Sequence, residues 1–270
     1  INKNRINSLW QQITWLNSHS ESYLGGNHYI ENLCTLIIGG LVFQSYQAEN
    51  IFKKNINLLE KELNSQILED GGHEERSSSY HLLLLDRILE VAFILEKTRK
   101  ERPDWLVNKI ESMTCWLEKT KLINNNLPRF NDSPTNICPP ISEILVFSYR
   151  YLEKKNDKAL LGLRKEISKF KDDSLKKKDI QSSYELSKII DLPNTGWTIL
   201  KPGHGWELVF KSGPSCPKHL PPHAHSDLFS FDLFYQGKPL IAEAGTSTYE
   251  NSKVRLYERS SWAHNTIQLG

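Results

Sequence analysis

The feature of this chain that most constrains its fold is a change in hydrophobic periodicity. Up to about residue 170, apolar residues recur at helical spacing, as Ile6, Leu9 and Ile13 do near the start. After Pro193 the sequence alternates or runs apolar between Gly and Pro turns, which is typical of strands. A run of helices followed by a run of strands predicts an all-α part and then an all-β part.

The domain boundaries are predicted from breaks in this pattern. We expect a helical domain over 1–180, a linker over 181–194 and a β domain over 195–270. The Lys-rich stretch at 171–179 is expected to be solvated, and 236–238 to form a short hairpin turn. The strands are predicted at 196–200, 206–211, 228–235 and 239–242.

Several helices can be placed from caps and breaks. Gly25-Gly26 interrupts the first helical segment, and Asn27 is expected to cap the next helix. The segment 78–97 is apolar nearly all round, so it should be buried on several sides. The remaining helices are predicted at 51–68, from Pro103 onward, at 141–154 and at 157–170.

Composition excludes several classes of protein. With 270 residues, 39% of them hydrophobic and 24% charged, the chain can bury a core. The net charge of +2 gives no reason to expect nucleic acid or a membrane surface as a partner. No apolar run reaches the roughly 18 residues of a spanning helix. The cysteines are far apart and are expected to be buried free thiols, with a disulfide left open: Cys34, Cys115, Cys138 and Cys216.

Two clusters of polar residues lie at breaks between predicted helices. Asn27 and His28 follow a glycine pair at a helix start, where the alternative is an ordinary cap beside a surface histidine. The loop at 70–81 places Arg76 four residues before Tyr80, on one face if the helix has begun. A cation near a phenol lowers the pKa of that phenol, so Arg76 is expected to act on Tyr80. The alternative is a charged loop in which Tyr80 simply packs.

A third cluster combines histidines with a carboxylate. Pro221 and Pro222 favour an extended backbone, on which the rings of His223 and His225 can share one side. Glu243 and His264 follow further along the chain. Two imidazoles and one carboxylate suit zinc, with water as the fourth ligand. Without an ion, these would be hydrogen-bonding core residues.

Together these segments resemble the heparinase II/III-like polysaccharide lyases, a group that includes related alginate lyases. The matches occur in family order over nearly the whole chain. They are Gly-Asn-His at 26–28, Asp-Gly-Gly-His-x-Glu-Arg-Ser-x-x-Tyr-His at 70–81, Phe-Asn-Asp-Ser at 130–133, His-Ala-His-Ser-Asp at 223–227, Gly-Lys-Pro-Leu-Ile at 237–241, Gly-Thr-x-x-Tyr at 245–249 and Arg-Ser-x-x-Ala-His-Asn-Thr at 259–266.

The resemblance implies a fold and a set of site residues. The fold would be an incomplete (α/α) toroid followed by the beginning of an antiparallel β-sandwich, with an acidic polysaccharide bound between them. The catalytic positions would be Asn27, His28, Tyr80 and His223, and the further substrate-binding positions Arg76 and Asn131. The zinc positions would be His225, Glu243 and His264, although the family usually has Asp where this chain has Glu243. A periplasmic or secreted location is also suggested by the resemblance.

The residue types suit a β-elimination. A lyase removes the proton at C5 of a uronate, so the adjacent carboxylate must first be neutralised, here by Asn27 and His28. Tyr80 would serve as both base and acid if the two groups lie on one face of the sugar. Otherwise His223 would be the base and Tyr80 the acid. The alternatives are a non-catalytic glycan-binding or assembly protein and a toroid glycoside hydrolase using a carboxylate pair chosen from Asp70, Glu74 and Glu75.

The ends of the sequence suggest a fragment truncated on both sides, since it starts at Ile1 without a Met and stops in an alternating stretch. A sandwich needs a second sheet to cover its apolar face. We therefore predict that residues 1–270 expressed alone are poorly soluble or partly folded, and inactive. Extending the C-terminus with the native continuation should restore cooperative unfolding. A sharp melting transition with full lyase activity from 1–270 alone would contradict this prediction.

Overall fold

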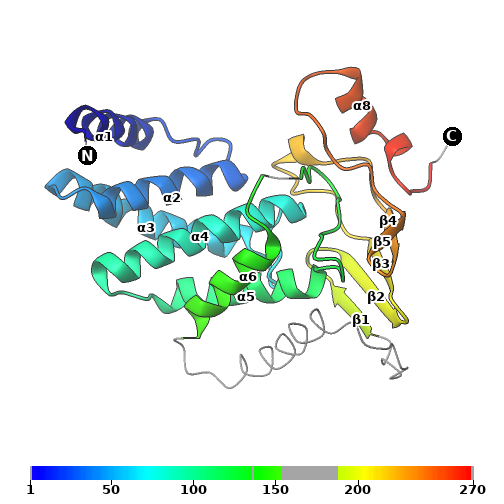
Figure 1. The fold of residues 1–270 in the computed structure, drawn as a ribbon. Helices are drawn as coiled ribbons and strands as arrows, with labels where there is room; N and C mark the ends of the chain where they lie inside the picture. The colour runs from blue at the N-terminus through cyan, green and yellow to red at the C-terminus, as the bar shows by residue number, and fades with distance from the viewer. Residues whose placement is uncertain (1, 136, 154–187, 269–270) are drawn as a thin grey trace.

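Figure 1 shows the computed structural model of the chain, which describes residues 2–135, 137–153 and 188–268. A group of helices lies beside one antiparallel sheet, and a late helix lies at the end of the sheet. The helices of the first part are α1 (Lys3–Ser18), α2 (Gly26–Val42), α3 (Tyr46–Gln66), α4 (Ser78–Arg99), α5 (Asp104–Thr120) and α6 (Ile141–Leu152). The late helix is α8 (Lys253–Arg259).

Helix α4 forms the centre of the helical part and contacts α2, α5 and α6. Its residues Leu84, Leu85, Ile88 and Leu89 are fully buried, as its apolar sequence predicts. Burying a leucine or isoleucine of this kind is worth about 1.5–3 kcal/mol. The helix begins at a conventional cap, because the side chain of Ser77 accepts a hydrogen bond from the backbone N–H of Tyr80. This cap places Tyr80 in the first turn.

The sheet is an antiparallel meander in which each strand pairs with the next in sequence. Strand residues of alternating burial divide it into two faces. The strands are β1 (Lys188–Leu192), β2 (Trp197–Gly203), β3 (Trp206–Lys211), β4 (Phe231–Tyr235) and β5 (Lys238–Ile241), and two short 3-10 turns follow β3 and α8, namely η1 (Pro221–His223) and η2 (Ser261–Ala263).

The inner face of the sheet packs against the helical part. Trp197 of β2 lies 5.3 Å from the ring of Trp116 in α5 and 5.2 Å from the ring of Phe130, measured between ring centroids. Val209 and Phe234 belong to the same buried cluster. The loop that carries Phe130 is therefore held between the two parts by aromatic packing.

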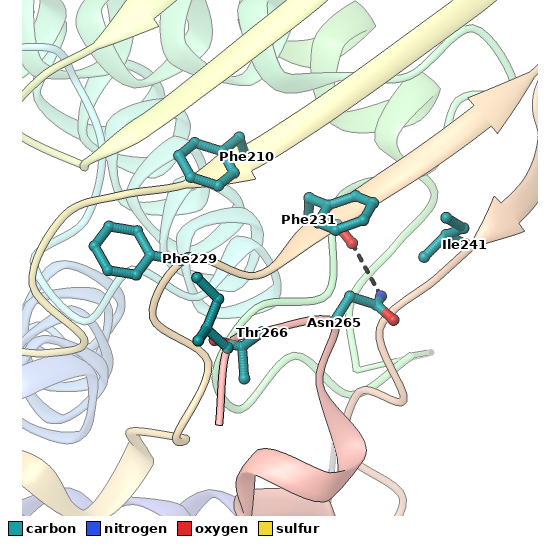
Figure 2. A pocket seen from close by; sticks show the side chains of 7 residues that line it. Phe210, Phe229, Phe231, Ile241, Asn265 and Thr266 are labelled. Carbon is teal, nitrogen blue, oxygen red and sulfur yellow. Dashed lines mark hydrogen bonds between the residues drawn. The ribbon is translucent and has the colours of Figure 1, made fainter. Parts of the chain in front are cut away.

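The outer face of the sheet is less covered. Figure 2 shows Phe210, Phe229 and Phe231 gathered with Ile241 around a hollow on this face. Phe229 and Ile241 are exposed, while the amide of Asn265 donates to the carbonyl of Phe231. The predicted β-sandwich would require a second layer on this face. The β-sandwich and the (α/α) toroid both remain predictions.

Most of the predicted order of elements is confirmed. Helices precede strands, and a two-residue turn at Gln236 and Gly237 joins β4 to β5. All four cysteines are free thiols, but only Cys34 is buried as predicted; Cys115, Cys138 and Cys216 are half-buried. Strand β1 lies inside the segment 181–194 that we expected to be a linker, because Leu192 and Ile190 alternate toward the buried face. The predicted helix at 157–170 and the Lys-rich stretch at 171–179 lie outside the described residues.

The residues that the structure describes show no candidate for a membrane span. Among the helices within 2–135, 137–153 and 188–268, none combines the length and hydrophobicity that crossing a bilayer requires.

The buried aromatic contact predicts where the sheet is most sensitive to substitution. Trp197→Ala in the full-length protein should lower the free energy of unfolding by about 3–5 kcal/mol, because it empties a packed site between the two parts. Ile189→Ala is the matched control, since Ile189 lies in β1 and is 72% exposed. Chemical denaturation compares the two. Equal losses from both variants would show that the junction does not depend on Trp197.

Candidate active site

The candidate site lies where loops of the helical part meet loops of the sheet. Tyr80 enters it from the first turn of α4 and is buried. Its hydroxyl oxygen lies 3.1 Å from Nδ1 of His223 and 2.7 Å from the hydroxyl of Tyr249. The ring of Tyr80 also meets the ring of His223 edge-on at 5.0 Å. A phenol and an imidazole in direct contact form a pair that can exchange protons with a substrate.

His223 is positioned by a turn rather than by the extended backbone that we expected. Pro221 and Pro222 start the 3-10 turn η1, which His223 ends. The fixed φ of proline suits the first positions of a helical turn as well as an extended chain, which explains the difference. Nδ1 of His223 lies 2.9 Å from Oδ2 of Asp132, and Nε2 lies 3.8 Å from Oε2 of Glu75.

Asn27 lies inside α2 and is not its cap, which corrects the sequence prediction. Gly25 is the N-cap, at φ 68° and ψ −150°, a conformation that only glycine adopts readily. The buried carboxylate of Glu75 instead accepts hydrogen bonds from the backbone N–H of Asn27 at 2.8 Å and from its side-chain amide at 3.0 Å. A negative charge at a helix N-terminus is favoured by the helix dipole.

The approach of Glu75 to this helix requires a glycine. A Cβ on Gly26 would lie 2.6 Å from Oε1 of Glu75 and 2.4 Å from Leu220. The next residue, His28, has a more exposed side chain, and its ring lies 6.2 Å from the ring of His223 in a stacked orientation. The structure thus brings together Asn27, His28, Tyr80 and His223.

Asp132 is a member of the site that the sequence prediction missed. It is fully buried and accepts hydrogen bonds from His223, from Nε2 of His225 at 2.8 Å and from both terminal nitrogens of Arg255 at 2.5 and 2.7 Å. Burial alone would raise the pKa of Asp132, but the hydrogen bonds from His223, His225 and Arg255 hold that pKa well below its usual range. Asp132 is therefore a carboxylate in the resting protein.

Two further residues, Tyr249 and Arg255, were also missed. Tyr249 follows β5 and contacts Tyr80, while the guanidinium of Arg255 lies 5.2 Å from the centre of the Tyr249 ring. Tyr249 stood in a Gly-Thr-x-x-Tyr stretch, and the pattern around it gave no chemical signal. Arg255 is in α8, a helix that the sequence pattern did not indicate.

The expected effect of Arg76 on Tyr80 is wrong. Arg76 precedes the helix with φ 53°, so the two residues do not share a helical face. Burial raises the pKa of Tyr80, and the hydrogen bond with Tyr249 and the negative charges of Asp132 and Glu75 raise it further. Tyr80 therefore holds its proton firmly in the resting protein.

The two predicted substrate-binding residues make contacts within the protein. Arg76 donates to the backbone carbonyls of Glu74, Asn194 and Thr195. Asn131 is fully buried, and its carbonyl oxygen accepts from Nζ of Lys211 at 2.7 Å. Both side chains join the helical part to the sheet, and their contact with substrate stays a prediction.

The three predicted zinc residues lie together. The rings of His225 and His264 are 5.3 Å apart between centroids, and Glu243 contacts Nδ1 of His264. Nδ1 of His225 and Nε2 of His264 are buried and have no hydrogen-bond partner within the protein. Imidazole nitrogens that ligate a metal ion are likewise without a hydrogen-bond partner. Both oxygens of Glu243 are engaged, one by His264 and the other by Ser230.

The two unpartnered imidazole nitrogens are of the type that ligates zinc, whereas the Glu243 carboxylate is held at Nδ1 of His264 and would have to turn to join them. Within the described residues no group of three or more His, Cys, Asp or Glu side chains is arranged as a metal site. The extra methylene of Glu243, compared with the Asp that the resemblance implies, allows the carboxylate to reach the imidazole instead.

Comparison with known proteins identifies the family. The N-terminal model of heparinase II/III matches residues 4–139, and the heparinase II/III-like C-terminal model matches residues 185–270. A heparin-sulfate lyase of Pedobacter heparinus is 25% identical over 276 residues, which cover 98% of this chain and 38% of that protein. A heparin-sulfate lyase of Bacteroides stercoris is 26% identical, over 90% of this chain and 35% of that protein.

Solved structures show the same fold. A crystal structure of heparinase III matches with a TM-score of 0.72 and 19% identity, over 96% of this chain and 41% of that one. A mutant of the heparan sulfate lyase from Pedobacter heparinus matches with a TM-score of 0.68 and 23% identity, over 98% of this chain and 40% of that one. The arrangement of helices and sheet is therefore that of a heparinase-like protein. The chain belongs to the heparinase II/III family and spans 38% of the length of the first curated relative.

Proposed function

We propose that this chain carries the active site of a polysaccharide lyase that cleaves a uronic-acid-containing polysaccharide by β-elimination. The observation that carries the proposal is the contact between Tyr80 and His223 beside the buried pair of Asn27 and Glu75. Because two relatives are heparin-sulfate lyases, heparan-type chains are the first substrates to test.

The first task of such a site is to neutralise the uronate carboxylate. Removing the C5 proton builds negative charge next to that carboxylate, so donors must already be in place. The amide of Asn27 is oriented by Glu75, and His28 presents a partly exposed ring next to His223. These two side chains would bind the carboxylate.

The second task is to move two protons. Since burial and its neighbours raise the pKa of Tyr80, the phenol keeps its proton and suits protonation of the leaving oxygen at C4. His223 then serves as the base that takes the C5 proton. This proposed assignment corresponds to the second of the two arrangements open from the sequence, in which base and acid are different residues.

The geometry supports the rival functions less well. A hydrolase needs two carboxylates free to flank the scissile bond. Glu75 is engaged by Asn27, and Asp70 accepts hydrogen bonds from the backbone N–H and hydroxyl of Thr195. A glycan-binding protein needs no pair of groups that transfers protons, so the contact between the phenol and the imidazole favours catalysis.

The product of the reaction separates these functions. We expect the full-length protein to release an unsaturated uronate, seen as ultraviolet absorbance, from a heparan-type, alginate or bacterial capsular polysaccharide. New reducing ends without that absorbance would indicate a hydrolase, and binding without cleavage a glycan-binding protein.

Tyr80→Phe tests the acid directly. The variant keeps the ring and its packing but removes the transferable proton, so activity should fall by a factor on the order of 10²–10⁴ with little change in folding. Tyr235→Phe is the control, because Tyr235 lies at the end of β4 and is partly exposed. Activity of Tyr80→Phe within a few-fold of the parent would remove Tyr80 from the mechanism.

We also propose that zinc binds at His225 and His264, with Glu243 as the third ligand after its side chain turns. The unpartnered nitrogens of the two imidazoles support this proposal. Zinc there would hold the loops of the sheet near the site without contacting substrate. Elemental analysis of the purified full-length protein should find one zinc ion per chain, lost in His264→Ala. Absence of metal from the parent would leave the two histidines as core residues.

A further inference from the structure

We propose that Asp132 is a positioning residue that sets the ring orientation and tautomer of His223. Its two oxygens bind two imidazoles at once, Oδ2 at Nδ1 of His223 and Oδ1 at Nε2 of His225. The inference deepens the proposed function, because it concerns the histidine that serves as the base.

The argument begins with what a carboxylate can do. An ionised carboxylate only accepts hydrogen bonds, so each imidazole nitrogen that faces Asp132 must carry a hydrogen. His223 is therefore protonated at Nδ1. A neutral imidazole has one N–H and one bare nitrogen, and the partner of one nitrogen decides the state of the other. The bare nitrogen of His223 is Nε2, which points away from Asp132 toward Glu75 and is the atom that can accept a proton from substrate.

The carboxylate itself is held in a fixed plane. Arg255 binds it with both terminal nitrogens, and Thr246 donates a further hydrogen bond to Oδ1 at 3.2 Å. Bidentate pairing of this kind fixes direction as well as distance. With Arg255 on one side, the remaining lone pairs of Asp132 face the two histidines.

The backbone of Asp132 joins the same segments. Its N–H donates to the carbonyl of His223 at 3.2 Å, and its own carbonyl accepts from the hydroxyl of Ser77 at 2.6 Å. Ser77 is the cap of the helix that carries Tyr80. One residue therefore sets the spacing between the proposed acid and the proposed base.

The contact with Tyr80 follows from the same tautomer. Because Nδ1 of His223 carries a single hydrogen, which Asp132 accepts at 2.9 Å, the Tyr80 oxygen 3.1 Å away can only be a second, shared acceptor of that hydrogen. The Tyr80 hydroxyl hydrogen is then free to point elsewhere, toward Tyr249 in the resting protein or toward a leaving oxygen. The same hydrogen bond would stabilise the phenolate left after that proton is donated.

Asp132→Asn in the full-length protein tests the inference. Asparagine has the same shape but offers one acceptor and one donor, so at least one imidazole loses its acceptor. We expect kcat to fall by a factor on the order of 10²–10⁴ with KM changed only a few-fold, the scale seen when a histidine base loses its orienting carboxylate. Glu207→Gln is the matched control, because Glu207 is a buried carboxylate at the junction that pairs with Lys201 and makes no contact with His223. The control should keep the parental kcat.

A second measurement does not depend on activity. Nitrogen NMR of protein with labelled histidine, assigned with His223→Gln, should show His223 protonated at Nδ1 in the parent. A parental kcat in a folded Asp132→Asn variant, or a His223 protonated at Nε2 in the parent, would overturn the inference. If the parent cleaves no uronate polysaccharide, the proposed function fails while the NMR result still decides the role of Asp132.

Discussion

The structure of the site depends on burying a carboxylate at the junction of the two parts. An unpaired carboxylate in such a place would cost several kcal/mol, so Asp132 must be surrounded by donors. The donors come from η1, from α8 and from the loop after β5, all of them in the second part of the chain. The need to satisfy this one charge draws distant segments around the loop that carries it.

A second buried ion pair stabilises the loop that carries Asp132. Lys211 of β3 is fully buried, and its ammonium contacts Asp227 and the carbonyl oxygen of Asn131. Burial lowers the pKa of Lys211, while the charge of Asp227 opposes that shift. Asn131 sits at φ 55°, a strained value for a residue other than glycine, and these contacts hold it there. The junction is thus specified by polar contacts as much as by the aromatic cluster around Trp197.

Local patterns in the sequence were sufficient to predict most helices and strands. They were not sufficient to predict the hydrogen bonds around Asp132. The period of the apolar residues predicts α4 and the strands β2 to β5, because each depends on residues close in the chain. Asp132 contacts residues that lie 91 and 123 positions later. No local pattern reports such contacts, so a carboxylate in a Phe-Asn-Asp-Ser loop looks like an ordinary turn residue. Tyr80 and His223 stood out in polar clusters of the sequence, but their catalytic roles could be assigned only through the family resemblance.

The central claim is that the site eliminates rather than hydrolyses, and the fate of water tests it most directly. The full-length protein should be incubated with its polysaccharide substrate in water enriched in heavy oxygen, and the products weighed by mass spectrometry. Elimination consumes no water, so the account predicts oligosaccharides that contain no heavy oxygen and whose masses sum to that of the parent chain. Products whose masses sum to that of the parent chain plus one water for each bond cleaved, with heavy oxygen at the new reducing end, would contradict it.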